Sequence, residues 1–482
     1  MIYYILFALF LIVSWYGLFL LFRKAGKQGW EAFIPFYREV IFADLVARPR
    51  WWVLWLLVPI VNVFVFFGLY FDLLKSFGKR RFWETAAAVL VPFIVLPMWG
   101  RDATVKYLGP SNTEEFKKKY PYKKSAVREW TDAIIFATVA ASLIRSFLIE
   151  PYVIPTGSME RTLLIGDFLF VSKLNYGARV PMTPLAFPFA HHTMPITGGK
   201  AYSEWIKIPY KRLPGFQEIK RNDVVVFNYP MDADAPFERP VDKRENYVKR
   251  CVGMPGDVIT MKSAQLFVNG EEAFESHNLQ PSYIVITEQP YGLDLNRLVE
   301  KRYELSTYLN DPSRGVYVLH ITREEAEEVR KWNNVKEVIE QVYGPDDNSE
   351  MAQAFPFYKD GTVWNYDNFG PFTIPKKGWT VKLDSKTLPL YIRAITVYEG
   401  NTLEERADGL YLNGKLADSY TFNMDYYWMM GDNRHNSLDS RGWGFVPEDH
   451  IVGKAVLTFM SYDEDGTFLS KIRWNRIFRG IN

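Results

Sequence analysis

The feature that most constrains this chain is a set of long apolar segments confined to roughly its first 150 residues. Residues 2–22 form an uncharged run of about the 20 residues that a helix needs to cross a bilayer. Arg23, Lys24 and Lys27 follow it at once, whereas a cleaved secretory signal carries its positive charge before the apolar core. We therefore expect a retained membrane helix whose C-terminal end faces the cytoplasm.

Residues 51–71 and 83–100 are two further apolar segments, and both contain proline. If both cross the membrane fully, the basic linker at 75–81 lies outside, against the tendency of Lys and Arg to stay in the cytoplasm. Re-entrant or interfacial hairpins would keep that linker inside. The sequence thus predicts a membrane region over residues 1–128 and leaves the number of crossings open.

The last apolar segment, residues 129–150, follows the basic run FKKKYPYKKSAVR, which should stay in the cytoplasm. This helix should therefore run from inside to outside, with Arg145 reaching the far interface. We expect a multi-pass protein of the cell membrane, in contact with the lipid bilayer, whose remaining chain lies on the outer face.

Composition separates this chain from several other classes of protein. Its 482 residues are 48% hydrophobic and 16% aromatic, enough to bury sizeable cores. The net charge is +2, and the basic residues cluster beside apolar runs, a pattern of membrane topology rather than of nucleic-acid binding. Cys251 is the only cysteine, so an intrachain disulfide is excluded, and a buried apolar role is expected for it.

From residue 151 onward the chain consists of short β-branched and aromatic runs separated by Gly, Pro and Asn, which is typical of strands. The predicted fold is mainly β: an antiparallel, barrel-like catalytic domain over 151–259 and 421–482, preceded by transmembrane helices. Residues 260–420 are expected to be an inserted β-rich accessory region without a chemical motif.

Two patterns give detail inside the insert. Asn269-Gly270 and Asn413-Gly414 each lie between alternating apolar residues, which is a strong hairpin signal. Residues 322–343 open with Thr322 and an acidic first turn, which predicts a capped amphipathic helix.

The candidate nucleophile is Ser158, in the stretch YVIPTGSMERTLLIGDFLF at 152–170. Pro155 and Gly157 favour a tight turn that exposes the serine, although such residues also crowd together in ordinary surface turns. The Thr156 hydroxyl and the Ser158 backbone N–H could both point at one developing oxyanion. Because a serine hydroxyl is a weak nucleophile, the chain must also supply a base.

The candidate base is Lys249, in YVKRCVGMPGD at 247–257. It is followed by Arg250, and neighbours on a strand face opposite ways, so only one of the two can face a site. Arginine does not lose its proton in a protein, whereas burial can make lysine a neutral amine. Lys249 is therefore the better base, unless it is simply a solvated residue at the end of a strand.

The most distinctive stretch is MMGDNRHNSLDSRGWGF at 429–445, which is dense in short polar residues and predicts an ordered loop. Ser437 is placed to orient a lysine amine, and Asp432, Asp439 and Arg441 can support the loop through charge-assisted bonds. A calcium site is the alternative, but the spacing differs from that of the EF-hand loop, so we expect no metal.

Histidine chemistry is not expected, because none of the six histidines lies in a recognisable triad context. There is no HExxH or Cys-His spacing for zinc, and we predict no cofactor. The Ser-x-x-Lys arrangement also fails, since Arg161 occupies the fourth position. His435, inside the polar loop, is the histidine that remains of interest.

Three motifs in this order behind an apolar segment resemble type I signal peptidase, a membrane-bound serine protease family. The resemblance covers roughly residues 130–258 and 422–460 and rests on three boxes: IPTGSMERTLLIGDFLFV, YVKRCVGMPGD and GDNRHNSLDSRGWGFVPEDHIVGKA. It implies that Ser158 is the nucleophile and Lys249 the general base. It also implies an oxyanion hole of Thr156 and the Ser158 amide, with Ser437 orienting the lysine.

The resemblance further implies the substrates and partners. They are secretory preproteins whose signal peptides have small residues at positions −1 and −3, and the protein export machinery is a further candidate partner. The chain departs from the family pattern in three places: position 435 is His where the family usually has Asp, the first 128 residues carry more apolar segments than usual, and the insert is long.

Two other functions fit some of the same residues. A self-cleaving repressor-type protease shares the Ser-Lys logic but predicts a soluble chain with a DNA-binding module, and the apolar segments argue against it. A membrane-tethered scaffold that binds exported chains without cutting them would be favoured by a missing nucleophile or base, and both are present.

Overall fold

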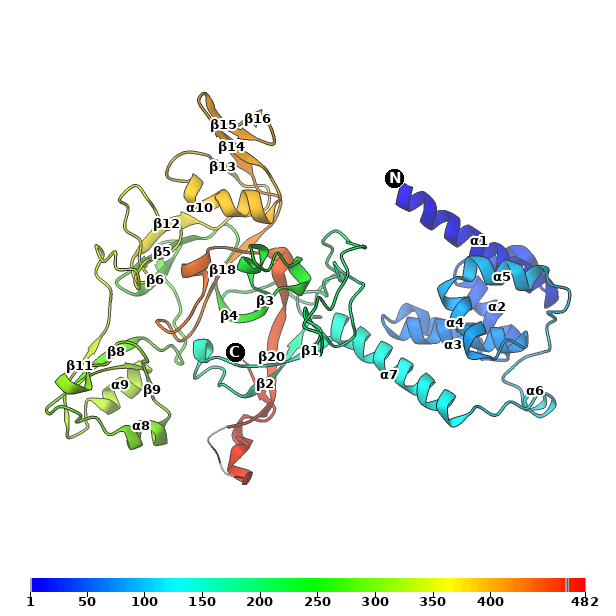
Figure 1. Cartoon of the computed structure of the whole chain (residues 1–482), viewed down its shortest axis with the longest axis horizontal. Coiled ribbons are helices and arrows are strands. Elements are labelled where there is room, and N and C mark those ends of the chain that lie inside the picture. Colours follow the sequence, from blue (N-terminus) through cyan, green and yellow to red (C-terminus); the bar gives the residue numbers. More distant parts are fainter. Residues whose placement is uncertain (1, 464–465, 467, 482) are drawn as a thin grey trace. The chain divides into compact units, whose positions relative to one another are not determined.

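The computed structural model describes residues 2–463, 466 and 468–481, and it divides into two compact units, residues 1–143 and 144–482. Helices dominate the first unit and strands the second (Figure 1). The whole chain is 33% helix and 23% strand. The expected β-sheet domain and the helices before it are both present, but the chain as a whole is mixed rather than mainly β, because the first unit is helical.

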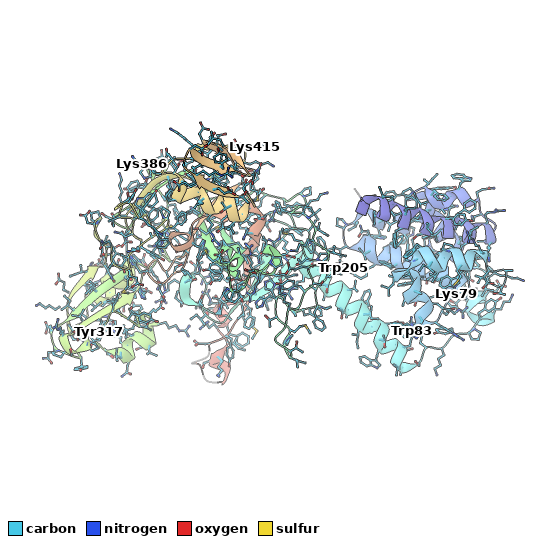
Figure 2. All side chains as sticks on the ribbon, turned by 45° about the horizontal axis from the view of Figure 1, so that its top comes forward. Lys79, Trp83, Trp205, Tyr317, Lys386 and Lys415 are labelled. Atoms are coloured by element: carbon cyan, nitrogen blue, oxygen red, sulfur yellow. The ribbon has the colours of Figure 1, made fainter. Side chains whose placement is uncertain are left out.

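The helices of the first unit follow the apolar segments of the sequence. They are α1 (Ile2–Lys24), α2 (Tyr37–Val46), α3 (Val61–Ser76), α4 (Phe82–Leu90), α5 (Pro92–Arg101), α6 (Glu114–Lys119) and α7 (Ala126–Phe147). Two short 3-10 helices, η1 (Gly29–Phe33) and η2 (Arg50–Leu57), lie between them. Large side chains remain on the surface of this unit, such as Trp83, which is 77% exposed (Figure 2).

Two glycines let α1 and α5 approach each other closely. A Cβ on Gly17 would lie 2.4 Å from Leu96 Cβ, and one on Gly100 would lie 2.5 Å from Leu20 Cβ. Each helix thus offers a glycine to a leucine of the other, which is the small-residue packing that membrane helices use.

Among the described residues, two helices are long and apolar enough to cross a membrane, α1 and α7. The predicted segment 51–71 is not one span, because η2 and α3 are separate helices on either side of Pro59, and α3 has 16 residues. Proline lacks the amide hydrogen that would continue the helix. The segment 83–100 forms α4 and α5, bent by 118° at a break before Pro92, so it is either a broken span or a re-entrant loop.

The centre of the second unit is an antiparallel half-barrel sheet, as the sequence predicted for the catalytic part. Its strand order is β1 (Ile149–Val153), β2 (Asp167–Ser172), β20 (Ile451–Ser461), β3 (Val224–Asn228), β4 (Asn246–Gly253), β18 (Tyr426–Met430) and β19 (Val446–Pro447), and β21 (Arg479–Gly480) also pairs with β20. The strands that carry the three sequence motifs therefore belong to one sheet.

The inserted region builds two four-stranded sheets, one two-stranded sheet and one three-stranded sheet. One sheet has the order β12 (Phe369–Thr373), β5 (Val258–Lys262), β6 (Gln265–Val268), β7 (Glu271–Glu272); the other has β11 (Val335–Glu340), β8 (Ser282–Thr287), β10 (Val316–His320), β9 (Glu304–Leu305). The small pieces are β13 (Thr380–Lys382) with β17 (Ser419–Thr421), and β14 (Leu403–Arg406), β15 (Gly409–Leu412), β16 (Lys415–Leu416).

Both Asn-Gly hairpins are confirmed. Residues 269–270 join β6 to β7 and residues 413–414 join β15 to β16, with positive φ at all four positions. Positive φ at both central residues is what a type I′ turn requires.

The predicted helix at 322–343 is wrong over most of its length. Helix α9 covers Arg323–Val329 and starts with the expected capping box of Thr322 and Glu325. The chain then turns through Asn333 and Asn334 and continues as β11, which pairs with β8. β-branched Val335, Val338 and Ile339 favour the strand, and pairing with a neighbouring strand decides the outcome.

The first insert sheet shares a core with the catalytic sheet. One buried cluster contains Trp428 and Phe445 of the catalytic part together with Met261, Phe372 and Ile374 of the insert. The second insert sheet, with α8 (Leu295–Lys301) and α9, has a core of its own. The insert is therefore packed partly into the catalytic sheet.

Candidate active site

Ser158 lies on a short turn directly after the edge strand β1. Ile154 N donates to Asp167 O at 2.9 Å, which ends the pairing with β2, and the 3-10 helix η3 (Gly157–Met159) follows. Met159 and Leu163, which follow the serine, are fully buried and fix the turn to the protein core. The serine side chain is thus held at the surface of the sheet by its buried neighbours.

Lys249 reaches Ser158 from strand β4, as the sequence predicted. Its Nζ donates to Ser158 Oγ at 2.5 Å, and the lysine is only 3% exposed. Arg250, the next residue, instead bonds Asp432 through Nε and Nη2 at 2.8 and 2.7 Å. The alternation of side chains along the strand therefore brings the lysine, and not the arginine, to the serine.

Burial lowers the pKa of Lys249 from 10.5 to about 8, because the ammonium form loses its hydration. The charges of Asp439 and Asp432 raise this pKa and limit the effect, while Arg441 adds to it. About a tenth of the amine is consequently neutral at pH 7, and the neutral amine is the form that can accept a proton.

The polar loop at 431–441 is held together by buried hydrogen bonds and also bonds to the serine turn. Arg441 binds the Asp439 carboxylate at 2.8 Å, and both side chains are almost completely buried. Asp439 also accepts the Gly431 amide at 3.0 Å, while Asn433 N donates to Ser158 O at 3.2 Å. The loop therefore fixes the nucleophile's backbone as well as its own shape.

Asp432 ties the loop to strand β4 and to the segment that follows the serine turn. Besides Arg250, it accepts the Thr162 hydroxyl at 2.6 Å, so one carboxylate joins β4 to the segment after the serine turn. The structure thus brings together Asp432, Asp439 and Arg441, the three residues that the sequence proposed as supports.

Ser437 and Thr156 lie near the pair without the bonds that were expected of them. The Ser437 hydroxyl is buried and has no hydrogen-bond partner among the described residues. A Cβ on Gly431 would lie 2.1 Å from Ser437 Oγ and 2.5 Å from Ser158 O, so only glycine fits there. Thr156 is exposed and its side chain does not cap η3.

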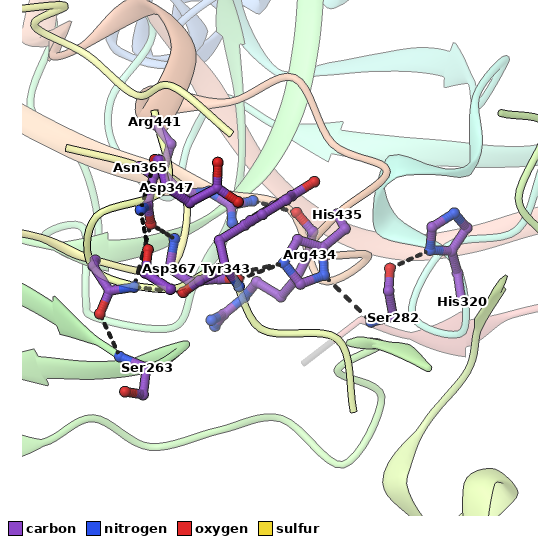
Figure 3. Close-up of polar contacts among 12 residues, drawn as sticks. Ser263, Ser282, His320, Tyr343, Asp347, Asn365, Asp367, Arg434, His435 and Arg441 are labelled. Carbon is purple, nitrogen blue, oxygen red and sulfur yellow. Dashed lines mark hydrogen bonds and ion pairs between the residues drawn. The ribbon is translucent and has the colours of Figure 1, made fainter. Parts of the chain in front are cut away.

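Two carboxylates of the insert contact the polar loop, which was not predicted from the sequence. Glu304 accepts the side-chain amides of Asn433 and Asn436, each at 2.6 Å. Asp367 accepts His435 Nε2 at 3.0 Å, and Ser282 N donates to His435 Nδ1 at 3.3 Å (Figure 3).

The His435–Asp367 pair explains how the loop tolerates its unusual residue. The resemblance leads one to expect an aspartate at 435, and here a histidine faces an aspartate that the insert supplies, with the two side chains 7% and 3% exposed. No local sequence signal identifies Asp367, since it lies in an ordinary turn far from the loop in the chain.

Comparison with known proteins decides the family. Residues 127–339 and 415–460 match the signal peptidase family, peptidase S26. The chain belongs to this family. Its activity is that of signal peptidase I, a serine peptidase that cleaves signal peptides from preproteins.

Individual members support the assignment over most of the chain. Signal peptidase I of Buchnera aphidicola from Acyrthosiphon pisum is 28% identical over 70% of this chain and 77% of its own length. That of Haemophilus influenzae is 25% identical over 81% and 86%, and that of Pseudomonas fluorescens 27% identical over 67% and 68%. Residues 30–110 match a family of unknown function, DUF5684.

No group of three or more His, Cys, Asp or Glu side chains in the described part of the chain is arranged to hold a metal ion. The carboxylates near the dyad are instead used in pairs with arginine, histidine or amide side chains.

Proposed function

We propose that Ser158 is the nucleophile and Lys249 the general base of this signal peptidase. The observation that carries the proposal is the 2.5 Å contact between Nζ and Oγ, made by a lysine that is 3% exposed. A base must lie within hydrogen-bond reach of the proton that it takes, and burial supplies the neutral amine.

The chemistry follows as two acyl transfers. Neutral Lys249 takes the hydroxyl proton while Ser158 Oγ attacks the scissile carbonyl, and the ammonium then protonates the amine that leaves as the peptide bond breaks. The lysine next takes a proton from water, whose oxygen attacks the acyl ester, and returns that proton to Ser158 Oγ as the signal peptide is released.

Thr156 and the backbone N–H of Ser158 are the proposed oxyanion hole. Thr156 directly precedes η3, in an extended conformation with φ −135° and ψ 154°, and its hydroxyl is not used for capping. A donor that is not already committed can turn to a developing negative charge.

Ser437 is the proposed residue that orients the lysine, because its buried hydroxyl has no hydrogen-bond partner in the described part of the chain and lies on the side of Gly431 that faces Ser158 O. Asp432, Asp439 and Arg441 support the site by holding the loop that carries it.

The signal peptide is proposed to bind as an added strand. β1 is the last strand on its side of the sheet, and β18 pairs with β4 only from Arg250 onward, which leaves residues 246–249 with an unpaired edge. An extended peptide can bond to such edges through its backbone. Small side chains at −1 and −3 would then face the shallow surface over Met159 and Leu163.

We also propose that α7 delivers this unit to the outer face of the cell membrane. The basic residues at its N-terminal side favour the cytoplasm, and none of its residues is buried within the protein, so its apolar side chains are free to meet lipid. Secretory preproteins, the lipid bilayer and the export machinery are the partners that this placement implies.

The test uses the full chain in detergent, with Ser158→Ala and Lys249→Ala variants, and a preprotein with an Ala-x-Ala site. Mass spectrometry of the new N-terminus should show cleavage after the second Ala by the parent and by neither variant. Cleavage by either variant would assign the chemistry to another residue.

A further inference from the structure

A pocket of about 280 Å³ opens beside Ser437 and is lined by both the insert and the catalytic loop. The insert contributes Tyr343, Met351 and Tyr366, and the loop contributes the four residues 435–438. The proposed mechanism uses only Ser437 of this set. The lining combines two tyrosines, Met351 and Leu438 with His435, Asn436 and Ser437, and its exposed surface is more polar than apolar.

Hydrogen bonds within the insert hold its side of this pocket in shape. Asn365 Nδ2 donates to Gly344 O at 2.7 Å, and Asn368 Nδ2 donates to Tyr343 O at 2.8 Å (Figure 3). Tyr366 N donates to Ala352 O at 2.9 Å, which fixes the segment that carries Met351. These bonds hold the 343–352 segment in place against the catalytic loop.

The two aromatic walls are fixed by the loop itself. The Tyr366 ring lies 4.6 Å from the Arg441 guanidinium, and the Tyr343 ring meets His435 edge-on at 5.6 Å. Met351 and Leu438 remain 58% and 52% exposed at the opening. Apolar side chains at a preformed opening are suited to bury an apolar group of a ligand.

The pocket lies where a substrate must continue past the scissile bond. The unpaired edge of β4 ends at Lys249, because Met430 of β18 pairs with Arg250, and β18 leads directly into the loop 431–438. A peptide that follows this edge to Ser158 therefore meets the loop next. Ser437 lines the pocket, and a Cβ on Gly431 would lie 2.1 Å from Ser437 Oγ and 2.5 Å from Ser158 O, so the pocket is next to the serine turn.

We propose that this pocket binds apolar or aromatic side chains from the first few residues of the mature protein, those that follow the cut. The proposal rests on the proposed dyad and on the signal peptide lying along the β4 edge. The pocket has room for one or two side chains, and it makes the insert a determinant of which preproteins are cut fastest.

The test measures kcat/KM for preproteins that are identical up to the cut and carry a single Leu, Tyr, Lys or Glu in an all-Ala stretch at mature positions 1 to 4. For the parent, Leu or Tyr at one of these positions should raise kcat/KM about tenfold over Ala. Met351→Glu should make Lys preferred over Glu at that same position, and Met351→Lys should reverse this choice.

The matched controls are Leu416→Glu and Leu416→Lys, on a residue that is 64% exposed in hairpin β15–β16 and does not line the pocket. They should keep the parent's preference. Each ratio compares two substrates on one enzyme sample, so a loss of folded protein does not change it. Equal rates for all mature sequences, or unchanged ratios in both Met351 variants, would overturn the pocket; absence of any cleavage would instead overturn the dyad.

Discussion

At the scale of single residues, the site depends on two adjacent basic side chains with opposite tasks. Lys249 and Arg250 are both buried, yet the arginine has a carboxylate partner and the lysine is placed against a neutral hydroxyl. A buried ammonium without a paired anion is costly, whereas a buried guanidinium with a bidentate partner is tolerated. The same strand thus supplies a structural cation and a titratable base.

The rate of cleavage should follow the neutral fraction of Lys249. Its pKa is lowered to about 8, so kcat/KM should fall about tenfold for each pH unit below that value and level off above it. The measurement is kcat/KM from pH 6 to 9.5 on one preprotein. A profile that is flat across pH 7 to 8 would show that the base titrates elsewhere.

Lys249→Met gives a stability test of the same residue. The pKa of the lysine is lower in the folded state than in the unfolded chain, so protonation below pH 8 favours the unfolded chain. The lysine therefore destabilises the fold there by on the order of 3 kcal/mol. This penalty disappears as the pH rises from 8 to 10.5. Met of similar volume should abolish cleavage without lowering the thermal unfolding midpoint at pH 7. A clear drop in that midpoint would mean that the Ser158 contact outweighs the burial penalty.

At the scale of elements, the sequence predicted the parts of the site that are local in the chain. The serine turn, the lysine strand and the polar loop each carry a short motif, and the structure brings them together as expected. Glu304 and Asp367 were missed because each meets the loop across more than 60 residues of chain. The end of α9 at Val329 was missed because strand pairing overrides helical periodicity.

The His435–Asp367 pair should couple the insert to the catalytic loop. Asp367→Asn and His435→Asn each remove one side of a buried pair, and each should lower kcat/KM about tenfold by loosening the loop that holds Ser158. The double variant should lose about as much as either single variant, which corresponds to a coupling of about 1 kcal/mol in a double-mutant cycle.

Asp360→Asn is the matched control for this cycle, since Asp360 is an exposed aspartate of the same insert. It should leave kcat/KM unchanged. Fully additive effects of the two changes at 367 and 435 would show that the pair does not act as a unit.

The packing of α1 on α5 should depend on its two glycines. Gly100→Leu would put a Cβ 2.5 Å from Leu20 Cβ, so the helices must separate, and we expect lower thermal stability and faster proteolysis of the membrane unit in detergent. Gly68→Ala, in α3, meets nothing within 4 Å and should stabilise by about 1 kcal/mol. Equal behaviour of the two variants would exclude a close helix contact.

At the scale of the whole molecule, the number of crossings is limited by where the basic residues and the active site must lie. With α1 and α7 as the crossings and α4–α5 as a re-entrant pair, the linker at 75–81 and the basic run at 117–124 share the cytoplasmic side. If α4–α5 were instead one complete span, that basic run would face outward and α7 would return the site to the cytoplasm. The positive-inside tendency favours the first arrangement, and so does the proposed placement of the site on the outer face.

The lone cysteine makes this topology measurable. Cys251 is fully buried and burial raises its pKa, so it should not react with a maleimide in the folded protein. The test introduces single cysteines at the exposed positions Arg81, Lys118 and Ser313 and adds a membrane-impermeant maleimide. We expect the cysteines at 81 and 118 to be labelled only after the cells are opened. The cysteine at 313 should be labelled in intact spheroplasts. Labelling at 81 but not 118 in spheroplasts would mean that the 51–71 region and α4–α5 both cross. Labelling at 118 would reverse α7 and refute the outward placement of the dyad, because only one helix separates that position from Ser158.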